Sequence, residues 1–415
     1  MRKCCIPCAN AKRKCDKQKN ECQRCIDRNF ECTYPTPKRP RRRLNSTGVS
    51  TTVDEASAVT QEHLPLPYST LMSGRGGVID ENYLNTAATS ENTLSTSATC
   101  PWFLGFDTWV MKHCDVTPTC STTLQLEPFI SSVEEMLRNW VQNGQNSFVH
   151  HRLYSHGMPA CIADAFTTLL SYMTCTPAVK DTILQIAEER AVKLVNQPAE
   201  ALHTTTKTAG PYGGSGAALE IWMQLARVQA LFVYEFIRLF DGNIRVRASA
   251  ELQLPILREW LSHLRETIQN FRGDELTSCA TQGNGTQSQF DKDYTAATNQ
   301  WHLWILAECV RRSHLIIDAV ANTYETMHKG WAECSGAVMF TARAGLWEAQ
   351  TATKWARLSN EKKPLLVASL TPGPLLDEYK SEDIDEFAKM YWTFIVGKDK
   401  IEYWVERSVS TVGVF

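Results

Sequence analysis

Seven of the fifteen cysteines in this 415-residue chain lie within its first 32 residues, and six of these follow a regular pattern. A C-x2-C-x6-C unit occurs twice, separated by six residues, and the two units contain Cys5, Cys8, Cys15, Cys22, Cys25 and Cys32. Thiolates at this spacing are typical ligands of structural zinc, which binds four of them in a tetrahedron. Two zinc ions need eight ligand positions from six sulfurs, so the pattern predicts two bridging thiolates, one from each unit. Cys4 stands outside the pattern.

The stretches between the cysteines differ in charge. The first unit contains three consecutive cations, Lys12, Arg13 and Lys14, whereas residues 26–31 of the second unit have a net charge of −1. The alanines within 9–11 favour a helix that would place these cations at its C-terminal end. We therefore expect a polyanion to approach the first unit, although a merely solvated helix end would carry the same residues.

A second basic segment follows the cysteines. It comes directly after Pro35 and Pro37, which favour an extended chain, and it contains Lys38, Arg39, Arg41, Arg42 and Arg43. Like charges at this density repel one another and do not pack. The segment suits a linker that follows DNA phosphates or a nuclear import signal, and a solvated tail with neither role is the alternative.

The charge of the whole chain is unevenly distributed. Residues 1–44 hold 14 Lys and Arg against 4 Asp and Glu, whereas residues 45–415 hold 29 against 41. A short basic N-terminal segment on a longer acidic chain indicates that this segment binds a polyanion.

The cysteine segment is too short to fold without metal. About 28 residues cannot bury enough apolar surface to form a stable domain, so metal binding must supply the folding free energy. We expect two Zn²⁺ ions per chain, and we expect a strong chelator to unfold the segment and abolish whatever it binds.

This cysteine pattern resembles the fungal Zn2Cys6 binuclear-cluster DNA-binding domain, whose pattern is C-x2-C-x6-C-x5–12-C-x2-C-x6–8-C. The resemblance covers under a tenth of the chain and implies that Cys5 and Cys22 bridge the two zinc ions. The ligands that complete the two sites, one pair for each ion, would be Cys8 and Cys15, and Cys25 and Cys32.

The resemblance also implies how the cluster binds double-stranded DNA. In the family, a lysine three positions before the third cysteine contacts guanine edges of CGG-like triplets, and Lys12 has this position. Lysine donors match the guanine N7 and O6 acceptors. Arg13 and Lys14 would mainly hold phosphates, which position a protein without reading sequence.

Two features depart from the family pattern. Ala9 and Ala11 stand where the family often has arginine, so phosphate affinity or triplet preference is expected to differ. Asn20 replaces the usual proline in the loop between the two units, and asparagine tolerates turn conformations.

The remainder of the chain divides by composition. Residues 45–99 contain 18 Ser and Thr and only seven charges, which predicts disorder. We expect a DNA-binding domain at 1–37, a basic and then Ser/Thr-rich linker at 38–100, and an α-helical regulatory domain at 101–415. Because residues 45–99 contain no heptad seam sustained over three heptads, a monomer, or a homodimer formed through the helical body, is as compatible with the sequence as coiled-coil pairing.

Apolar residues at helical spacing predict an all-α body. The first apolar face runs from Phe129 to Val141 and ends at Gly144, a plausible C-cap. A later face is expected to bury four residues, Val179, Ile183, Ile186 and Leu194. Further helices are expected near 162–173, 179–194, 217–240, 245–271, 293–324, 336–357 and 383–406, with long loops near 197–216 and 272–290.

The body lacks common enzyme signatures. It has no G-x-x-x-x-G-K-[ST] loop, no G-x-S-x-G elbow and no H-E-x-x-H motif, and it has no apolar stretch long enough for a membrane span. His150, His151 and His156 have no ligand partners nearby, so we expect surface histidines. Six tryptophans on apolar faces are expected in the core, with an aromatic ligand pocket as the alternative: Trp222, Trp260, Trp301, Trp304, Trp347 and Trp355.

A second resemblance lies in the body. The stretches Trp301–Arg312 and Phe340–Trp347 are similar to C-terminal regions of fungal zinc-cluster regulators associated with secondary-metabolite gene clusters. Together these features predict a nuclear, sequence-specific regulator of RNA polymerase II transcription that is not an enzyme, with a body that regulates or contacts the transcription machinery. The alternatives are a helical enzyme and a protein adaptor, each with a zinc-binding appendage, and an adaptor would have no need of the cations at 12–14 and 38–43.

Overall fold

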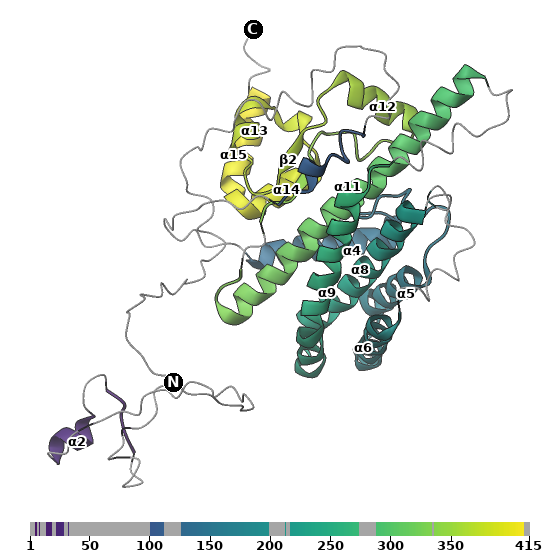
Figure 1. Ribbon diagram of the computed structural model, residues 1–415. Coiled ribbons are helices and arrows are strands. Elements are labelled where there is room, and N and C mark those ends of the chain that lie inside the picture. Colours follow the sequence, from purple (N-terminus) through teal and green to yellow (C-terminus); the bar gives the residue numbers. More distant parts are fainter. Residues whose placement is uncertain are drawn as a thin grey trace, which may run out of the picture. The chain divides into compact units, whose positions relative to one another are not determined.

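The chain forms two compact units, residues 1–62 and 63–415. The computed structural model describes residues 5, 8, 14–18, 22–28, 32, 100–111, 126–198, 212, 216–273, 288–333 and 336–410. In the first unit we call residues 5–32 the cysteine cluster, which contains the short helix α2 (Gln23–Asp27). The second unit is the helical body (Figure 1).

The helical body consists mainly of α-helices, which confirms the all-α prediction. Short 3₁₀-helices and a two-stranded sheet complete its described part. The elements in chain order are η2 (Phe106–Trp109), α4 (Leu126–Asn143), α5 (Ala160–Thr174), α6 (Lys180–Asn196), α8 (Gly216–Phe240), α9 (Ile244–Asn270), α11 (Gln289–Lys329), β1 (Met339–Thr341), α12 (Ala352–Glu361), β2 (Leu366–Ala368), α13 (Gly373–Glu378), η4 (Ser381–Asp383), α14 (Glu386–Val396) and α15 (Lys398–Ser410).

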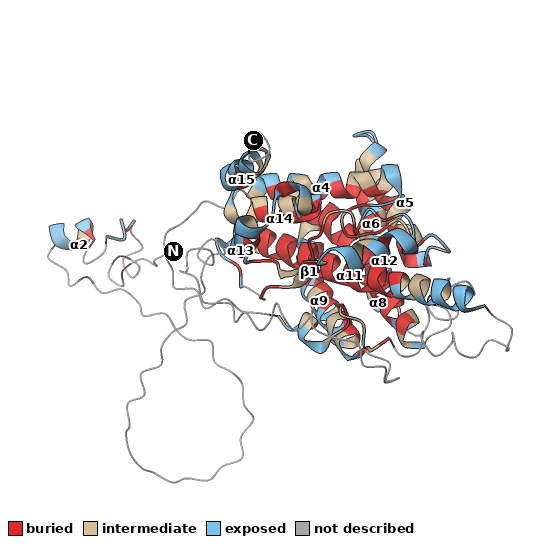
Figure 2. Cartoon of the chain, turned by 90° about the horizontal axis from the view of Figure 1, so that it is seen from above, coloured by how far each residue is buried: buried red, intermediate tan, exposed pale blue. Residues whose placement is uncertain are grey.

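Helix α8 lies at the centre of one layer. Nearly all of its residues from Ile221 to Leu239 are buried, including the charged pair Glu235 and Arg238, whose carboxylate oxygen and guanidinium nitrogen lie 2.6 Å apart. It packs against α5, α6 and α9, and less extensively against α11. Figure 2 shows buried residues running through α8 and the adjoining part of α11.

Helix α11 is the longest helix and crosses the body (Figure 1). No glycine or proline interrupts residues 289–329. The Ser288 hydroxyl caps its start by accepting from the Asp291 N–H at 3.1 Å, and Gly330 ends it at a φ of 85°, a left-handed conformation that glycine adopts without steric cost. Its residues from Trp301 to Tyr324 are buried, with few exceptions, whereas its first turns are exposed.

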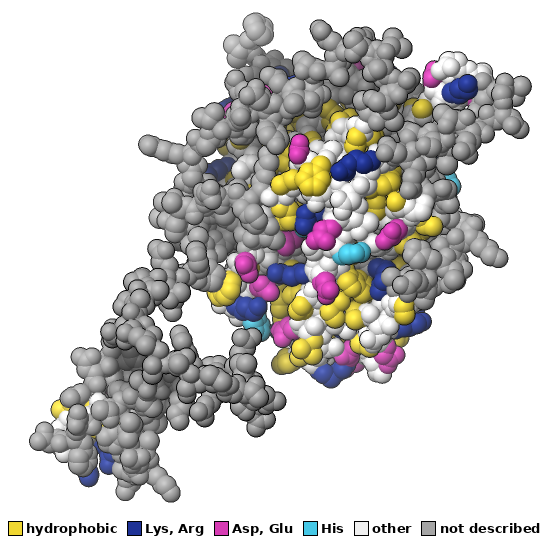
Figure 3. All heavy atoms as spheres, viewed as in Figure 1, with side chains coloured by type: hydrophobic (Ala, Val, Ile, Leu, Met, Phe, Trp, Pro, Cys, Tyr) yellow, Lys and Arg dark blue, Asp and Glu magenta, His cyan; other side chains and the backbone are white. Residues whose placement is uncertain are grey.

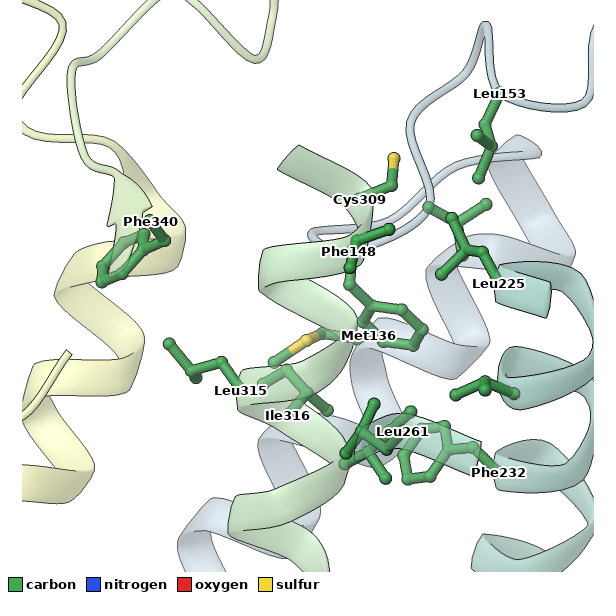
Figure 4. Close-up of a cluster of buried hydrophobic side chains, with 14 of the residues drawn as sticks. Met136, Phe148, Leu153, Leu225, Phe232, Leu261, Cys309, Leu315, Ile316 and Phe340 are labelled. Carbon is green, nitrogen blue, oxygen red and sulfur yellow. The ribbon is translucent and has the colours of Figure 1, made fainter. Parts of the chain in front are cut away.

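The core joins segments that are far apart in the sequence. Figure 4 shows side chains from α4, α8, α9, α11 and β1 converging with those of the loop after α4. The labelled residues are Met136, Phe148, Leu153, Leu225, Phe232, Leu261, Cys309, Leu315, Ile316 and Phe340. All of them are buried in one continuous apolar cluster.

The predicted face of α4 is confirmed, but that of α6 is wrong except for Leu194. In α4 the buried residues include Phe129 and Trp140, and the helix ends before Gly144 at a φ of 71°. In α6 only Leu194 of the predicted residues is buried, and the rest of the buried side is formed by Leu184, Ala187 and Ala191, while Val179 is 46% exposed. Alanines on this face let α6 approach α8 closely, and the sequence pattern gave them no weight.

The helix predicted at 336–357 is wrong. Residues 339–341 form β1, which pairs antiparallel with β2 so that Phe340 faces Val367. Gly345 follows at a φ of 87°, which interrupts any helix. The Thr341 N–H also donates to the Glu308 carboxylate of α11 at 2.9 Å, so a contact remote in sequence stabilises the extended backbone. Only α12 within this region is helical.

The helix predicted at 383–406 is two helices. Gly397, at a φ of 96°, separates α14 from α15. The Asp385 carboxylate caps the start of α14 by accepting from the Ala388 N–H at 2.8 Å.

The histidine prediction is wrong for His150, while the tryptophan prediction is confirmed. His150 is 1% exposed, and its Nε2 lies 3.0 Å from the Trp347 carbonyl oxygen, whereas His156 is exposed. The nearby aromatic rings that bury His150 come from segments distant in the sequence. Trp222, Trp301, Trp304, Trp347 and Trp355 are buried, and Trp260 is half-buried against the same core.

The predicted linker at 38–100 lies outside the described residues, apart from Cys100, and so do most residues of the two predicted long loops. Among the described helices, none is both long and apolar enough to span a bilayer.

Candidate metal centre

The six pattern cysteines come together in the cysteine cluster. Two groups of four sulfurs form there, and within each group all Sγ atoms lie within 4.8 Å of one another. The first group is Cys5, Cys8, Cys15 and Cys22, and the second is Cys5, Cys22, Cys25 and Cys32.

The sulfur spacing matches the edges of a zinc–thiolate tetrahedron. The Sγ of Cys5 lies 3.6 Å from that of Cys22 and 3.7 Å from those of Cys25 and Cys15. A tetrahedron with zinc–sulfur bonds of about 2.3 Å has sulfur–sulfur edges of about 3.8 Å. A disulfide would bring two sulfurs to about 2.05 Å, and these cysteines are free. The donor set and its geometry therefore fit two zinc ions.

Cys5 and Cys22 belong to both groups of four. Two tetrahedra that share an edge require two shared sulfurs, and the structure offers these two. This arrangement fits the bridging roles that the family resemblance implies. Four of the ligands are 0% exposed, namely Cys5, Cys8, Cys22 and Cys25. These buried sulfurs would shield bound metal from water.

The short helix α2 positions the second cysteine unit. Cys22 precedes α2 as its N-cap residue, and Cys25 lies within the helix. The Asp16 carboxylate accepts from the Gln23 N–H at 3.1 Å, which satisfies a free donor of the helix start. Cys25 is thereby held one helical turn from Cys22.

Hydrogen bonds favour the thiolate form of two ligands. The Cys22 N–H donates to the Cys32 Sγ at 3.2 Å, and this bond lowers the pKa of Cys32. A backbone hydrogen bond from Cys5 lowers the pKa of Cys15 to about 7. Burial instead raises the pKa of Cys25 to about 12. Since zinc binds thiolates, its uptake must release protons, and its affinity must fall in acid.

Sequence reasoning missed one side chain at the cluster. The Arg24 Nη1 donates to the Cys8 Sγ at 3.5 Å. This bond joins the second cysteine unit to a ligand of the first and places a positive charge beside a cluster of anionic sulfurs. An arginine within the C-x2-C of the second unit was the available signal, but only the fold shows which sulfur it contacts.

The structure describes one of the predicted DNA-binding residues. Lys14 lies next to Cys15, outside any helix, with its side chain exposed. Lys12, Arg13 and the basic segment at 38–43 lie outside the described residues, as does Cys4. Of the residues in the helix predicted around 9–14, the structure therefore describes only Lys14.

The helical body shows no comparable centre. Within the described ranges, no further group of three His, Cys, Asp or Glu residues brings its ligand atoms as close as those of the cysteine cluster. On the face of the body seen in Figure 3, basic and acidic side chains are interspersed rather than gathered by sign.

Comparisons with known proteins agree with this geometry. Residues 3–41 match the fungal Zn(2)-Cys(6) binuclear cluster domain, a domain that binds two zinc ions through six cysteines. The "Transcription factor gsfR2" of Penicillium aethiopicum is 24% identical to the chain over 426 residues, an alignment that covers 98% of this chain and 95% of that protein. No solved structure matches the chain.

Proposed function

We propose that this chain, which carries a fungal Zn(2)-Cys(6) domain, is a nuclear, sequence-specific regulator of RNA polymerase II transcription that binds CGG-like half-sites in DNA. The observation that carries the proposal is the pair of four-sulfur groups that share Cys5 and Cys22, within a segment that matches that domain. A rigid two-zinc core can hold neighbouring cations at a fixed orientation to a base pair.

In this proposal the basic residues have two roles. Lys12 reads a guanine edge in the major groove, where its donors meet N7 and O6. Arg13, Lys14 and the segment at 38–43 hold phosphates, which supply affinity without sequence information. The segment at 38–43 also serves as the nuclear import signal.

The helical body is the regulatory part of the protein. The similarity to a transcription factor extends over 98% of the chain and so includes the body as well as the cluster. We assign to the body contact with the transcription machinery and, where the chain pairs, homodimerisation. The genes controlled are a metabolic or secondary-metabolite set, as the similarity of 301–312 and 340–347 to such regulators implies.

The competing functions are a helical enzyme and a protein adaptor. The transcription-factor similarity supports a protein that is not an enzyme. The charge surplus of residues 1–44 favours DNA over a protein partner.

The test is selection of random duplex DNA by the full-length, zinc-loaded chain. We expect enrichment of a CGG-containing motif and an affinity that falls steeply with salt, because each neutralised phosphate releases counterions. Recovery of no motif would reject sequence-specific binding.

Lys12→Ala separates base reading from phosphate binding. We expect a cost of about 1–3 kcal/mol at one base position and relaxed specificity there. Arg13→Ala is the control, expected to weaken binding to all sequences alike. Uniform weakening by Lys12→Ala would reassign Lys12 to a phosphate.

A further inference from the structure

A cavity opens to the surface between α5, α6 and α8 of the helical body. Its volume is about 300 Å³, at the lower end of the range of about 300–1,000 Å³ for small-molecule sites in proteins. The three helices pack against one another, so packed helices form most of the cavity wall.

The inner wall of the cavity is aromatic and apolar. Trp222, Met223 and Tyr234 of α8 line it and are each at most 3% exposed. The Trp222 Nε1–H donates to the Leu153 carbonyl at 3.0 Å, so the indole offers the cavity no free polar group there. Leu194 of α6 adds apolar surface. Flat aromatic molecules pack well against such side chains.

The rim of the cavity carries a surplus of positive charge. Arg190 is held in place, because its Nη1 donates to the Asp164 carbonyl at 2.7 Å and to the Thr168 hydroxyl at 2.6 Å. Its Nη2 also lies 3.6 Å from the Asp164 carboxylate. Lys193, one turn further along α6, is exposed and forms no ion pair with the described residues. The rim therefore has one carboxylate, that of Asp164, and two cations, Arg190 and Lys193.

The start of α5 adds to the positive potential at the rim of the cavity. The helix begins at the cavity rim, after Pro159, without a side-chain cap and without an acidic residue in its first turn. The uncapped N–H groups of a helix start favour a negative charge nearby.

We propose that this cavity binds a small aromatic anion, a carboxylate of one or two rings, with its ring against the apolar wall and its charge toward Lys193 and Arg190. Such a molecule would be an effector of the regulator. That effector role rests on the proposed function, whereas the binding itself does not.

Binding at this site is reversible and non-covalent. Cys161 lines the cavity, but burial raises the pKa of its thiol to about 12, so the nucleophilic thiolate is scarce at neutral pH.

The test is isothermal titration calorimetry on the full-length, zinc-loaded chain with benzoate and 2-naphthoate. Neutral 2-naphthamide is the matched probe, since it keeps the rings and lacks the charge. We expect one site per chain, with 2-naphthoate binding about tenfold more tightly than 2-naphthamide. Equal affinities for the charged and neutral probes, or no binding of either acid, would overturn the proposal.

Two variants test whether the probes bind in this cavity. Lys193→Glu is expected to weaken 2-naphthoate about tenfold and to change 2-naphthamide binding less than twofold. Ala160→Trp adds an indole at an exposed position of the cavity lining and should abolish binding of both probes. Lys354→Ala, at an exposed lysine of α12 remote from the cavity, should change neither. Unchanged binding in both site variants would overturn the location.

Failure of this proposal is distinguishable from failure of the proposed function. A chain that selects a DNA motif but binds neither acid loses the cavity assignment alone. A chain that binds 2-naphthoate in the cavity but selects no DNA motif loses the regulatory function alone.

Discussion

In the cysteine cluster the buried side chains are sulfurs, whereas in the helical body they are tryptophans, leucines, phenylalanines and other large apolar groups. The described core of the cluster contains only its six cysteines. The core of the body extends from Phe103 to Trp404 as one apolar cluster. The first region therefore depends on bound metal for its folded state, while the second is stabilised by the removal of apolar surface from water.

The body also buries a charged network, which the described part of the cluster lacks. The Arg312 Nε donates to the Glu308 carboxylate at 2.9 Å, and its Nη2 contacts Asp385. The same Glu308 carboxylate accepts from the Thr341 N–H and hydroxyl, both at 2.9 Å. Because Glu308, Arg312 and Asp385 are almost fully buried, these groups must satisfy one another. The network joins α11, β1 and the start of α14.

Because the two regions are stabilised differently, we expect each to unfold without the other. Loss of metal should unfold the cluster and leave the body intact, while a defect in the body's core should leave zinc binding intact. Four experiments test this separation, in decreasing order of expected effect.

Metal removal should have the largest effect. A strong chelator, or Cys22→Ala at a shared ligand position, should reduce specific DNA affinity by at least about a thousandfold, to the level of non-specific binding. The far-ultraviolet circular dichroism of the body should be retained. Cys100→Ala, at an exposed cysteine outside the cluster, should bind DNA normally. Retained specific binding after complete zinc loss would contradict the metal-dependent fold.

Breaking the buried network should have the next largest effect. Glu308→Ala leaves Arg312 and the Thr341 N–H without a main partner, and should lower the free energy of unfolding of the body by about 3–5 kcal/mol. Denaturant unfolding measures this value. Glu134→Ala is the matched control, because its exposed pair with Arg138 is worth less than about 0.5 kcal/mol. Equal losses in the two variants would mean that Glu308 is not a structural centre of the body.

Acid should destabilise the body through its buried histidines. Burial lowers the pKa of His314 to about 3, whereas an unfolded histidine titrates near pH 6.5. Between these values the unfolded state binds more protons, so stability falls as the pH is lowered, by about 1.4 kcal/mol per pH unit for each such histidine. Above pH 6.5 this contribution does not vary.

The variant His314→Leu should reduce that slope between pH 6 and 4 by about 1.4 kcal/mol per unit, measured by denaturant unfolding at each pH. His156→Gln, at an exposed position, is the control. An unchanged slope in His314→Leu would show that His314 is accessible to protons in the folded body.

The smallest effect concerns a helix cap. The Asn243 side-chain oxygen accepts from the Arg245 N–H at 3.1 Å at the start of α9. Asn243→Ala should lower the stability of the body by about 1 kcal/mol and leave DNA binding unchanged. Asn143→Ala, at an exposed residue in the last turn of α4, should have little effect. A change in DNA affinity in Asn243→Ala would show that the two regions are coupled.

Sequence reasoning was accurate where a feature is local. The twofold C-x2-C-x6-C spacing predicts zinc ligation because the ligand geometry repeats within a few residues. The face from Phe129 to Trp140 and the glycine that ends α4 are likewise set within a few helical turns. The tryptophans could be placed in the core because so large an apolar surface is rarely left in water.

Sequence reasoning failed where the decisive partner lies far along the chain. The segment at 336–357 has apolar residues at helical spacing, yet its backbone pairs with β2 and bonds to Glu308. His150 was expected at the surface, but Trp347, almost two hundred residues later, covers it. On the buried face of α6, Ala187 and Ala191 lie between Leu184 and Leu194, and alanine is a weak apolar signal.

Ligand spacing and apolar periodicity are properties of short segments, so they sufficed to predict the chemistry of the cysteine cluster and the helical character of the body. The folded structure was needed to show which charges are buried together and that α5, α6 and α8 surround a cavity. Those features depend on which segments pack against each other, and packing is the sum of many weak contacts between residues that no local pattern connects.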